Sequence, residues 1–135
     1  MEWHKKYETG NEEVDNEHKE IFALVKKVIN AAFDSQEEKI ETTIDFLADY
    51  TIRHFAHEER IMEESNYPDT DIHKKQHQDF VKDVVALKER VMVESDSRKS
   101  SIEVNNVIVD WLTAHVLGSD KVMAEYYRKW SRKNK

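Results

Sequence analysis

The hydrophobic residues of this 135-residue chain recur at steps of three and four along four long segments. Such spacing marks the inward face of an amphipathic helix. Polar residues that could bind a metal stand in these columns without shifting their step, so we expect them to face the interior of a helical bundle. The columns are Val14, His18, Ile21, Val25, Ile29 and Ala32; Ile40, Ile44, Leu47, Thr51, His54, Glu58 and Ile61; His73, His77, Phe80, Val84, Leu87 and Val91; and Val104, Ile108, Trp111 and His115.

Capping residues predict where the first two helices begin. Asn11, or Thr9 with Glu12, can begin the first helix, and Ser35 with Glu38 forms a capping-box pattern for the second. These residues satisfy backbone N–H groups that have no partner within the first helical turn.

The other two helix starts follow a proline and a polar stretch. Pro68 cannot continue the second helix, and Asp69 or Thr70 can cap the third. Ser100 with Glu103 repeats the capping-box pattern, so we expect the polar residues 95–100 to form a loop before the fourth helix.

Short connections between long amphipathic helices favour an all-α, antiparallel up-down-up-down four-helix bundle. The length suits a single domain over residues 1–135. We expect an N-terminal arm over residues 1–10, a bundle over residues 11–133 and a short C-terminal helical extension. Trp3 and Tyr7 of the arm are expected to cover one end or flank of the bundle.

The composition supports this fold and excludes several kinds of site. With two Gly and one Pro, the chain has few residues for the turns of an all-β protein, and the absence of Cys excludes disulfides and thiolate ligands. A formal net charge of −7 argues against a nucleic-acid partner. No apolar run approaches the roughly 20 residues of a membrane span, and residues 1–6 lack the apolar centre of a signal peptide, so we expect a soluble cytoplasmic protein.

Seven inward residues have the types and spacings of metal ligands. His54 and Glu58 are four residues apart, as are His73 and His77, so the members of each pair project to the same side, about 40° apart on the helix. In an antiparallel bundle the late part of one helix lies beside the early part of the next, so all four helices bring candidates to one level. The seven candidates are His18, His54, Glu58, His73, His77, His115 and Asp120.

The number of candidate ligands indicates two metal ions with one free coordination position. Five imidazoles and two bridging carboxylates supply nine metal–ligand bonds. Two six-coordinate ions need twelve, and a shared oxide or hydroxide takes two, which leaves one position open. Nitrogen and oxygen ligands without sulfur suit iron, with manganese as an alternative, and the number of ligands disfavours a tetrahedral zinc site.

The step of five residues between His115 and Asp120 breaks the helical register. On a regular α-helix five residues separate two side chains by about 140°, too far for a shared site. The apolar column resumes at Met123, Tyr127 and Trp130, which indicates one extra residue in the turn. We therefore predict a π-type bulge or kink over residues 116–119, eased by Gly118.

Four motifs together resemble the hemerythrin family, in particular its free-standing bacterial members. They are D-x-x-H at residues 15–18, HFxHEE at residues 54–59, YP followed by H-x-x-x-H at residues 67–77, and WLxxHxxxxD at residues 111–120. They span nearly the whole chain, and their joint spacing is far more specific than any one pair.

The resemblance implies a function and assigns the ligands. His73, His77 and His115 would hold one iron, and His18 and His54 the other, with Glu58 and Asp120 bridging and an oxide or hydroxide shared between the metals. Dioxygen would bind reversibly, end-on at the two-histidine iron, and be held as a hydroperoxide for transport, storage or delivery. The apolar residues expected to line the oxygen pocket are Phe55, Trp111, Leu112 and Val116.

Other functions and roles were weighed on the same residues. No His has a Glu three residues before it, as ferritin-like di-iron oxidases require, and Ile61 breaks the H-E-x-x-H motif of zinc proteases. Five imidazoles with two carboxylates suit dioxygen binding better than strong oxidative chemistry, so we expect a binding protein and not an enzyme. A di-iron enzyme acting on peroxide or nitric oxide, an oxygen or iron sensor, and an iron-storage protein remain alternatives. His57 is expected at the surface or beside the ligands, and His4 away from the metal.

Overall fold

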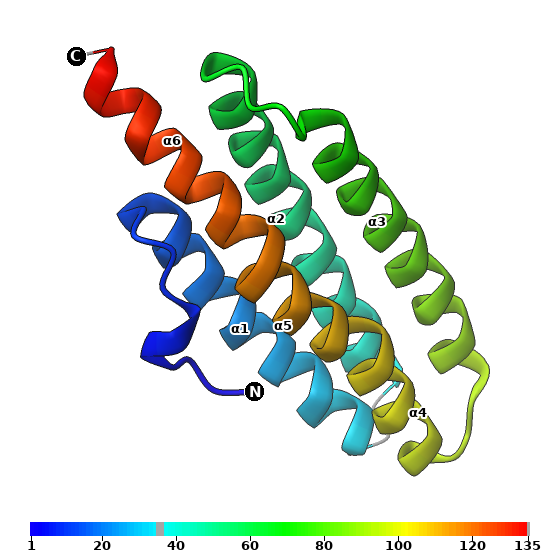
Figure 1. Ribbon diagram of the computed structural model, residues 1–135. Coiled ribbons are helices and arrows are strands. Elements are labelled where there is room, and N and C mark those ends of the chain that lie inside the picture. Colours follow the sequence, from blue (N-terminus) through cyan, green and yellow to red (C-terminus); the bar gives the residue numbers. More distant parts are fainter. Residues whose placement is uncertain (35–36, 135) are drawn as a thin grey trace.

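The computed structural model describes residues 1–34 and 37–134. Four antiparallel helical rods make up the bundle (Figure 1), and no strand occurs among the residues described. The predicted all-α four-helix bundle is therefore confirmed. The first three rods are α1 (Glu12–Phe33), α2 (Glu37–Glu64) and α3 (Thr70–Val93). The fourth is a continuous rod of α4 (Ser97–Val104), η2 (Asn105–Val109), α5 (Asp110–His115), η3 (Val116–Asp120) and α6 (Lys121–Lys133).

The caps of two helices test the predicted starts. Asn11 caps α1, where its side chain accepts a hydrogen bond from the Val14 N–H at 3.1 Å, as predicted. The predicted start of the fourth helix is wrong, because Asp96 caps α4 and accepts from the Arg98 N–H at 2.9 Å. Ser100 is buried inside α4 and caps nothing, since the earlier Asx cap starts the helix first. The predicted cap of α2 at Ser35 with Glu38 lies outside the described residues and side chains.

Helix α2 ends four residues before Pro68, so the proline is not the residue that stops it. Asn66 adopts a left-handed conformation with φ of 53°, and the Tyr67 N–H donates to the Met62 carbonyl at 2.9 Å. This closure satisfies late carbonyls of α2 and stops the helix at Glu64. Asp69 is the N-cap residue of α3 but makes no side-chain cap bond.

The predicted inward columns form most of the core, but Ile29 and Trp111 are only partly buried at its edge. An apolar cluster that includes Val25, Leu47, Val84 and Ile108 fills the half of the bundle toward the C-terminus of α1. A smaller cluster with Val14, Ile61, Met62, Tyr67 and Met123 fills the other half. The candidate ligands lie between these two clusters, so hydrocarbon seals them from both ends of the bundle.

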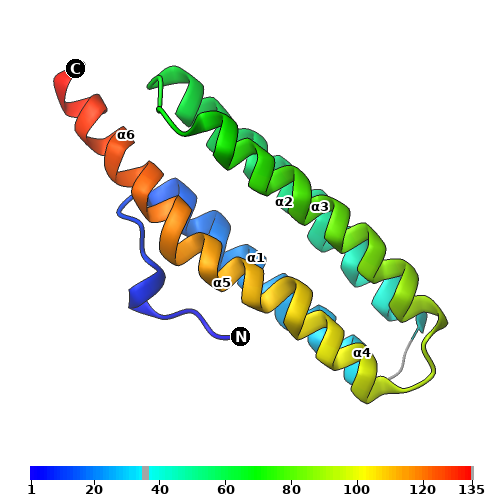
Figure 2. The same cartoon turned by 45° about the vertical axis from the view of Figure 1, so that its right-hand side comes forward.

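The N-terminal arm lies along the outside of the bundle, as predicted (Figure 2). It contains η1 (Lys5–Tyr7), and the rings of Trp3 and Tyr7 pack on Phe22 with ring centroids 5.2 and 4.9 Å apart. Asp15 anchors the arm, because its Oδ1 accepts from both the N–H and the hydroxyl of Thr9 at 2.8 Å. Across residues 1–34 and 37–134, no helix is long and apolar enough to span a membrane.

Candidate metal centre

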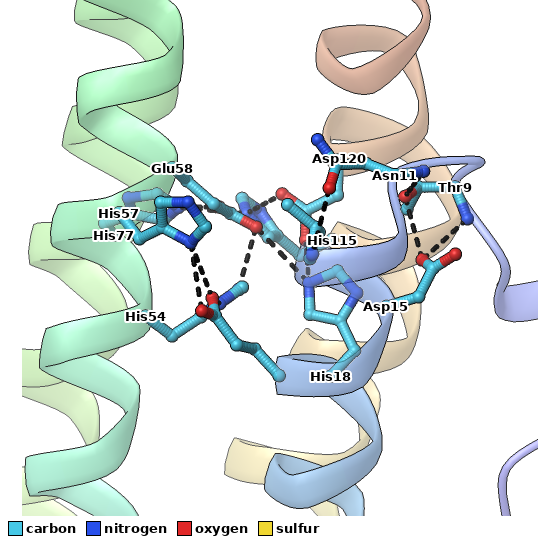
Figure 3. Close-up of polar contacts among 12 residues, drawn as sticks. Thr9, Asn11, Asp15, His18, His54, His57, Glu58, His77, His115 and Asp120 are labelled. Carbon is cyan, nitrogen blue, oxygen red and sulfur yellow. Dashed lines mark hydrogen bonds and ion pairs between the residues drawn. The ribbon is translucent and has the colours of Figure 1, made fainter.

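All seven predicted ligands meet at one level of the bundle core. Each is at most 6 % exposed, and together they come from all four rods. Figure 3 shows the imidazoles of His18, His54, His77 and His115 gathered around the carboxylates of Glu58 and Asp120. The helical columns therefore brought together the six candidate ligands that their register placed inward, and Asp120 joins them from the π-helical segment η3.

The seven residues form two groups that share both carboxylates. One group is His18 and His54 with the two carboxylates, and the other is His73, His77 and His115 with the same two carboxylates. Within each group, one donor atom per residue lies within 4.8 Å of the others.

Glu58 offers a different oxygen to each histidine group. Its Oε2 lies 2.8 Å from His54 Nε2 and 3.3 Å from His18 Nε2. Its Oε1 lies 3.0 Å from His77 Nε2 and 3.4 Å from His73 Nε2. A carboxylate oriented in this way can connect two neighbouring cations.

Asp120 repeats this arrangement from the fourth rod. Its Oδ2 lies 3.0 Å from His18 Nε2, and its Oδ1 lies 3.1 Å from the Nε2 atoms of both His73 and His115. The centre thus has two imidazoles on one side, three on the other and two carboxylates between them.

A π-helical turn places Asp120 in the cluster. η3 covers Val116–Asp120, so the predicted bulge is confirmed. Its wider turn lets a residue five positions after His115 face the same side. Gly118 is not required for this conformation: it is absent from the residues with positive φ, and a Cβ there would meet nothing within 4 Å.

A second π-helical segment, η2, was not predicted. The column Val104, Ile108 and Trp111 runs through it in regular steps of four and three. Because the spacing of this apolar column does not change, the sequence carries no signal of the wider π-helical turn.

Several buried polar atoms of the cluster have no hydrogen-bond partner among the described residues. They include His54 Nε2, Glu58 Oε1, His73 Nε2 and Asp120 Oδ1. These atoms are close enough for ion pairing, but the contacts lack hydrogen-bond geometry. In addition, the Nε2 atoms of His77 and His115 face each other at 3.2 Å. Convergent, poorly hydrogen-bonded nitrogen and oxygen atoms in a buried site are a donor set that fits metal cations.

The pKa values of the histidines indicate which positive charges a bound metal would replace. Burial alone would lower the pKa of His18 and His73, but contacts with Asp120 and Glu58 raise it to about 9 in both. Burial likewise opposes the charge of His54, but the Glu58 charge and a hydrogen bond to Glu17 raise its pKa to about 10. Without a metal, protons therefore supply the positive charge that the two carboxylates require.

The carboxylates respond in the opposite direction. Burial would raise the pKa of Glu58, but His54 and His18 hold it well below its usual value. Burial and the Glu58 charge would raise the pKa of Asp120, but His115 and His18 lower it. Both groups stay ionised, as metal-bridging carboxylates must be.

Two further carboxylates, which the sequence analysis missed, hold candidate ligands from outside. His54 Nδ1 lies 2.6 Å from Glu17 Oε1, and His77 Nδ1 lies 2.9 Å from Glu59 Oε2. If each Nδ1–H donates to its carboxylate, the Nε2 lone pair is left for a metal. Each carboxylate is next to a candidate ligand in the sequence, which was the available signal.

His57 lies beside the ligands, as predicted. Its side chain is 19 % exposed, and its Nδ1 lies 3.0 Å from Glu17. Burial would raise the pKa of Glu17, but its hydrogen bonds with His54 and His57 keep it lowered. Neither His57 nor His4 belongs to the two groups of candidate ligands.

Removal of either outer carboxylate is expected to weaken one metal position more than the other. Glu17→Ala should weaken binding at the His18 and His54 group about ten- to hundredfold, and Glu59→Ala should do so at the three-histidine group. Titration of the metal-free protein with Fe²⁺ or Co²⁺ under argon would separate the two affinities. Glu13→Ala is the matched control, because exposed Glu13 contacts His57 and no candidate ligand. Equal weakening of both positions by the two variants would contradict this assignment.

Aromatic rings cover the three-histidine group. Phe55 stacks on His77 with centroids 3.7 Å apart, and Trp111 stacks on His115 at 4.3 Å. Leu112 is buried in the main apolar core. Val116, the fourth residue predicted for the pocket, is buried with Tyr7 and Phe22 beneath the arm. The role of these four residues as an oxygen pocket stays a prediction.

The fold and the cluster define a class: a helical bundle that could hold metal cations among buried histidines and carboxylates. A family model described as the Hemerythrin HHE cation binding domain matches residues 9–127. The chain belongs to the hemerythrin family.

Curated relatives agree with this assignment. A bacteriohemerythrin of Stenotrophomonas maltophilia is 31 % identical over 123 residues, covering 91 % of this chain and 78 % of its own. A bacteriohemerythrin of Clostridium acetobutylicum is 28 % identical and covers 88 % of this chain and 95 % of its own. A hemerythrin-like protein of Naegleria gruberi is 30 % identical and covers 87 % and 86 %. The similarity therefore extends over most of each chain.

Proposed function

We propose that this protein binds dioxygen reversibly at a carboxylate-bridged di-iron centre and serves as a carrier, store or delivery protein. The observation that carries the proposal is the orientation of Glu58 and Asp120, each of which directs one oxygen to the two-histidine group and the other oxygen to two members of the three-histidine group. Membership of the hemerythrin family supports the same function.

The proposed ligands are those that the sequence predicted. His73, His77 and His115 would hold one iron, His18 and His54 the other, and both carboxylates would connect them. When bound there, iron would supply the redox chemistry that allows dioxygen to bind and leave again, and an oxide or hydroxide would complete the centre.

The residues of the chain would keep this chemistry reversible by excluding water and fixing the ligands. The buried apolar clusters close both ends of the site, and Phe55, Trp111 and Leu112 would wall the space beside it. Glu17 and Glu59 would hold two imidazoles in the orientation required for binding. A carrier needs such shielding, because water and protons promote loss of bound dioxygen as reduced species.

The function is tested by iron content and by the response to air. The purified protein is expected to hold about two iron ions per chain and to develop a visible absorption in air that vanishes under argon over repeated cycles. His77→Ala should lose metal, whereas His4→Ala should not, because His4 lies in the arm outside both ligand groups. Irreversible oxidation on first exposure to air, or catalytic turnover of peroxide or nitric oxide, would assign the protein to the enzymes instead.

A further inference from the structure

A layer of four buried side chains closes the candidate centre on the side toward the C-terminus of α1. In each rod the residue three positions from a candidate histidine lies one helical turn away on the same face. Because neighbouring rods are antiparallel, this step runs forward along α1 and α3 and backward along α2 and α5 (Figure 1). It leads from His18, His54, His77 and His115 to Ile21, Thr51, Phe80 and Leu112, each at most 2 % exposed.

This layer faces the imidazole side of the cluster. Glu58 follows His54 by one turn, and Asp120 follows His115 across the π turn, so both carboxylates approach from the opposite side. Helical side chains also lean toward the N-terminus of their helix, which brings the His54 ring toward the level of Thr51.

Thr51 contributes the one polar side-chain atom among the four residues of this layer. Its Oγ1 is buried and has no hydrogen-bond partner among the described residues. Two other hydroxyls near Thr51 in the sequence bond to carbonyls of α2: Thr43 Oγ1 donates to Lys39 at 2.7 Å, and Ser65 Oγ donates to Ile61 at 2.8 Å. Ser101 Oγ in α4 is likewise buried without a partner among the described residues, but it lies far from the candidate ligands in its rod. A buried hydroxyl without a partner is destabilising, so its presence in a hydrocarbon layer calls for a partner.

We propose that the Thr51 hydroxyl is a hydrogen-bond donor to the small ligand held beside His18 and His54. The inference rests on the proposed function and makes that side of the centre specific for diatomic molecules that accept a hydrogen bond. Thr51 would act as a binding residue, and the three hydrocarbon neighbours in its layer would keep water from competing for the hydroxyl.

The test replaces the hydroxyl by a methyl group of similar shape. Thr51→Val is expected to release dioxygen about three- to tenfold faster under argon, as measured by decay of the visible absorption. In the metal-free protein the same variant should unfold at equal or higher urea concentration than wild type, because it removes an unpaired polar group. Thr51→Ser, which keeps the hydroxyl, should restore slow release. Ile44→Val serves as a packing control two turns along the same column, with lower stability and unchanged release.

The outcomes separate this inference from the function on which it rests. If wild type binds dioxygen reversibly and Thr51→Val releases it at the wild-type rate, the inference is wrong and the proposed function stands. Lower stability of metal-free Thr51→Val with unchanged release would assign the hydroxyl a structural role and overturn the inference. If wild type does not bind dioxygen reversibly, both proposals fail.

Discussion

Insertion of one alanine between Gly118 and Ser119 is expected to abolish metal binding while the bundle stays helical. Asp120 is shared by both groups of candidate ligands, and η3 already accommodates one extra residue between it and His115. One more residue would rotate Asp120 by about 100° away from the cluster. Iron or Co²⁺ content per chain and the far-ultraviolet circular dichroism would measure the two effects.

Deletion of Gly118 is the informative counterpart, because it should be tolerated. It would convert the π turn into a regular α-turn and leave the aspartate four residues after His115, the same spacing as His54 and Glu58. Gly118→Ala should also keep both metals, since its Cβ would contact nothing within 4 Å. Retention of two metals by the insertion variant, or their complete loss in the deletion variant, would refute the role assigned to the register of this turn.

The metal-free protein is expected to lose several kcal/mol of stability as the pH rises from about 6.5 to about 10, whereas the loaded protein is not. The folded-state pKa is about 9 for His18 and His73 and about 10 for His54, above the ordinary histidine value of 6.5. Their contribution is therefore fully present below pH 6.5 and is lost as the pH passes the folded-state values. Each pKa unit corresponds to about 1.4 kcal/mol.

The carboxylates of Glu58 and Asp120 stabilise the metal-free fold down to low pH. Because the folded state lowers the pKa of Glu58 and Asp120, their contribution is present above the unfolded-state pKa and is lost only as the pH falls through the lower folded-state values. Urea unfolding of chelator-treated and metal-loaded protein at matched pH would measure the difference. Glu58→Gln should reduce the alkaline loss in the metal-free protein. Parallel stability curves for the two forms would contradict the prediction, since metal-bound imidazoles carry no titrating proton.

Because the candidate histidines are protonated in the metal-free fold, metal binding is expected to release protons. A cation that enters the two-histidine group would displace protons from His18 and His54, both of which stay protonated at neutral pH in the metal-free fold. The bundle can therefore fold around its buried carboxylates before metal arrives. Folding and loading can be separate steps, because protonated imidazoles already neutralise the site.

The sequence alone determined the features that depend on helical register. The steps of three and four placed His18, His54 and His77 on inward faces, and the antiparallel order of the rods placed them at one level. Even the π turn before Asp120 could be predicted, because its extra residue shifts the apolar column. Register is a local property of the chain, so a shift in the pattern of apolar residues records it; η2 left no such shift and could not be predicted.

Only the tertiary structure decided how side chains from distant elements meet. It showed that Glu17 and Glu59 support His54 and His77, and that Val116 packs beneath the N-terminal arm. It also showed that the Thr51 hydroxyl has no hydrogen-bond partner within residues 1–34 and 37–134. The structure further showed that Asp96, and not the predicted Ser100, caps α4. These features depend on distances across the bundle and on which polar atoms form hydrogen bonds there. Neither leaves a repeating pattern along the sequence from which it could be predicted.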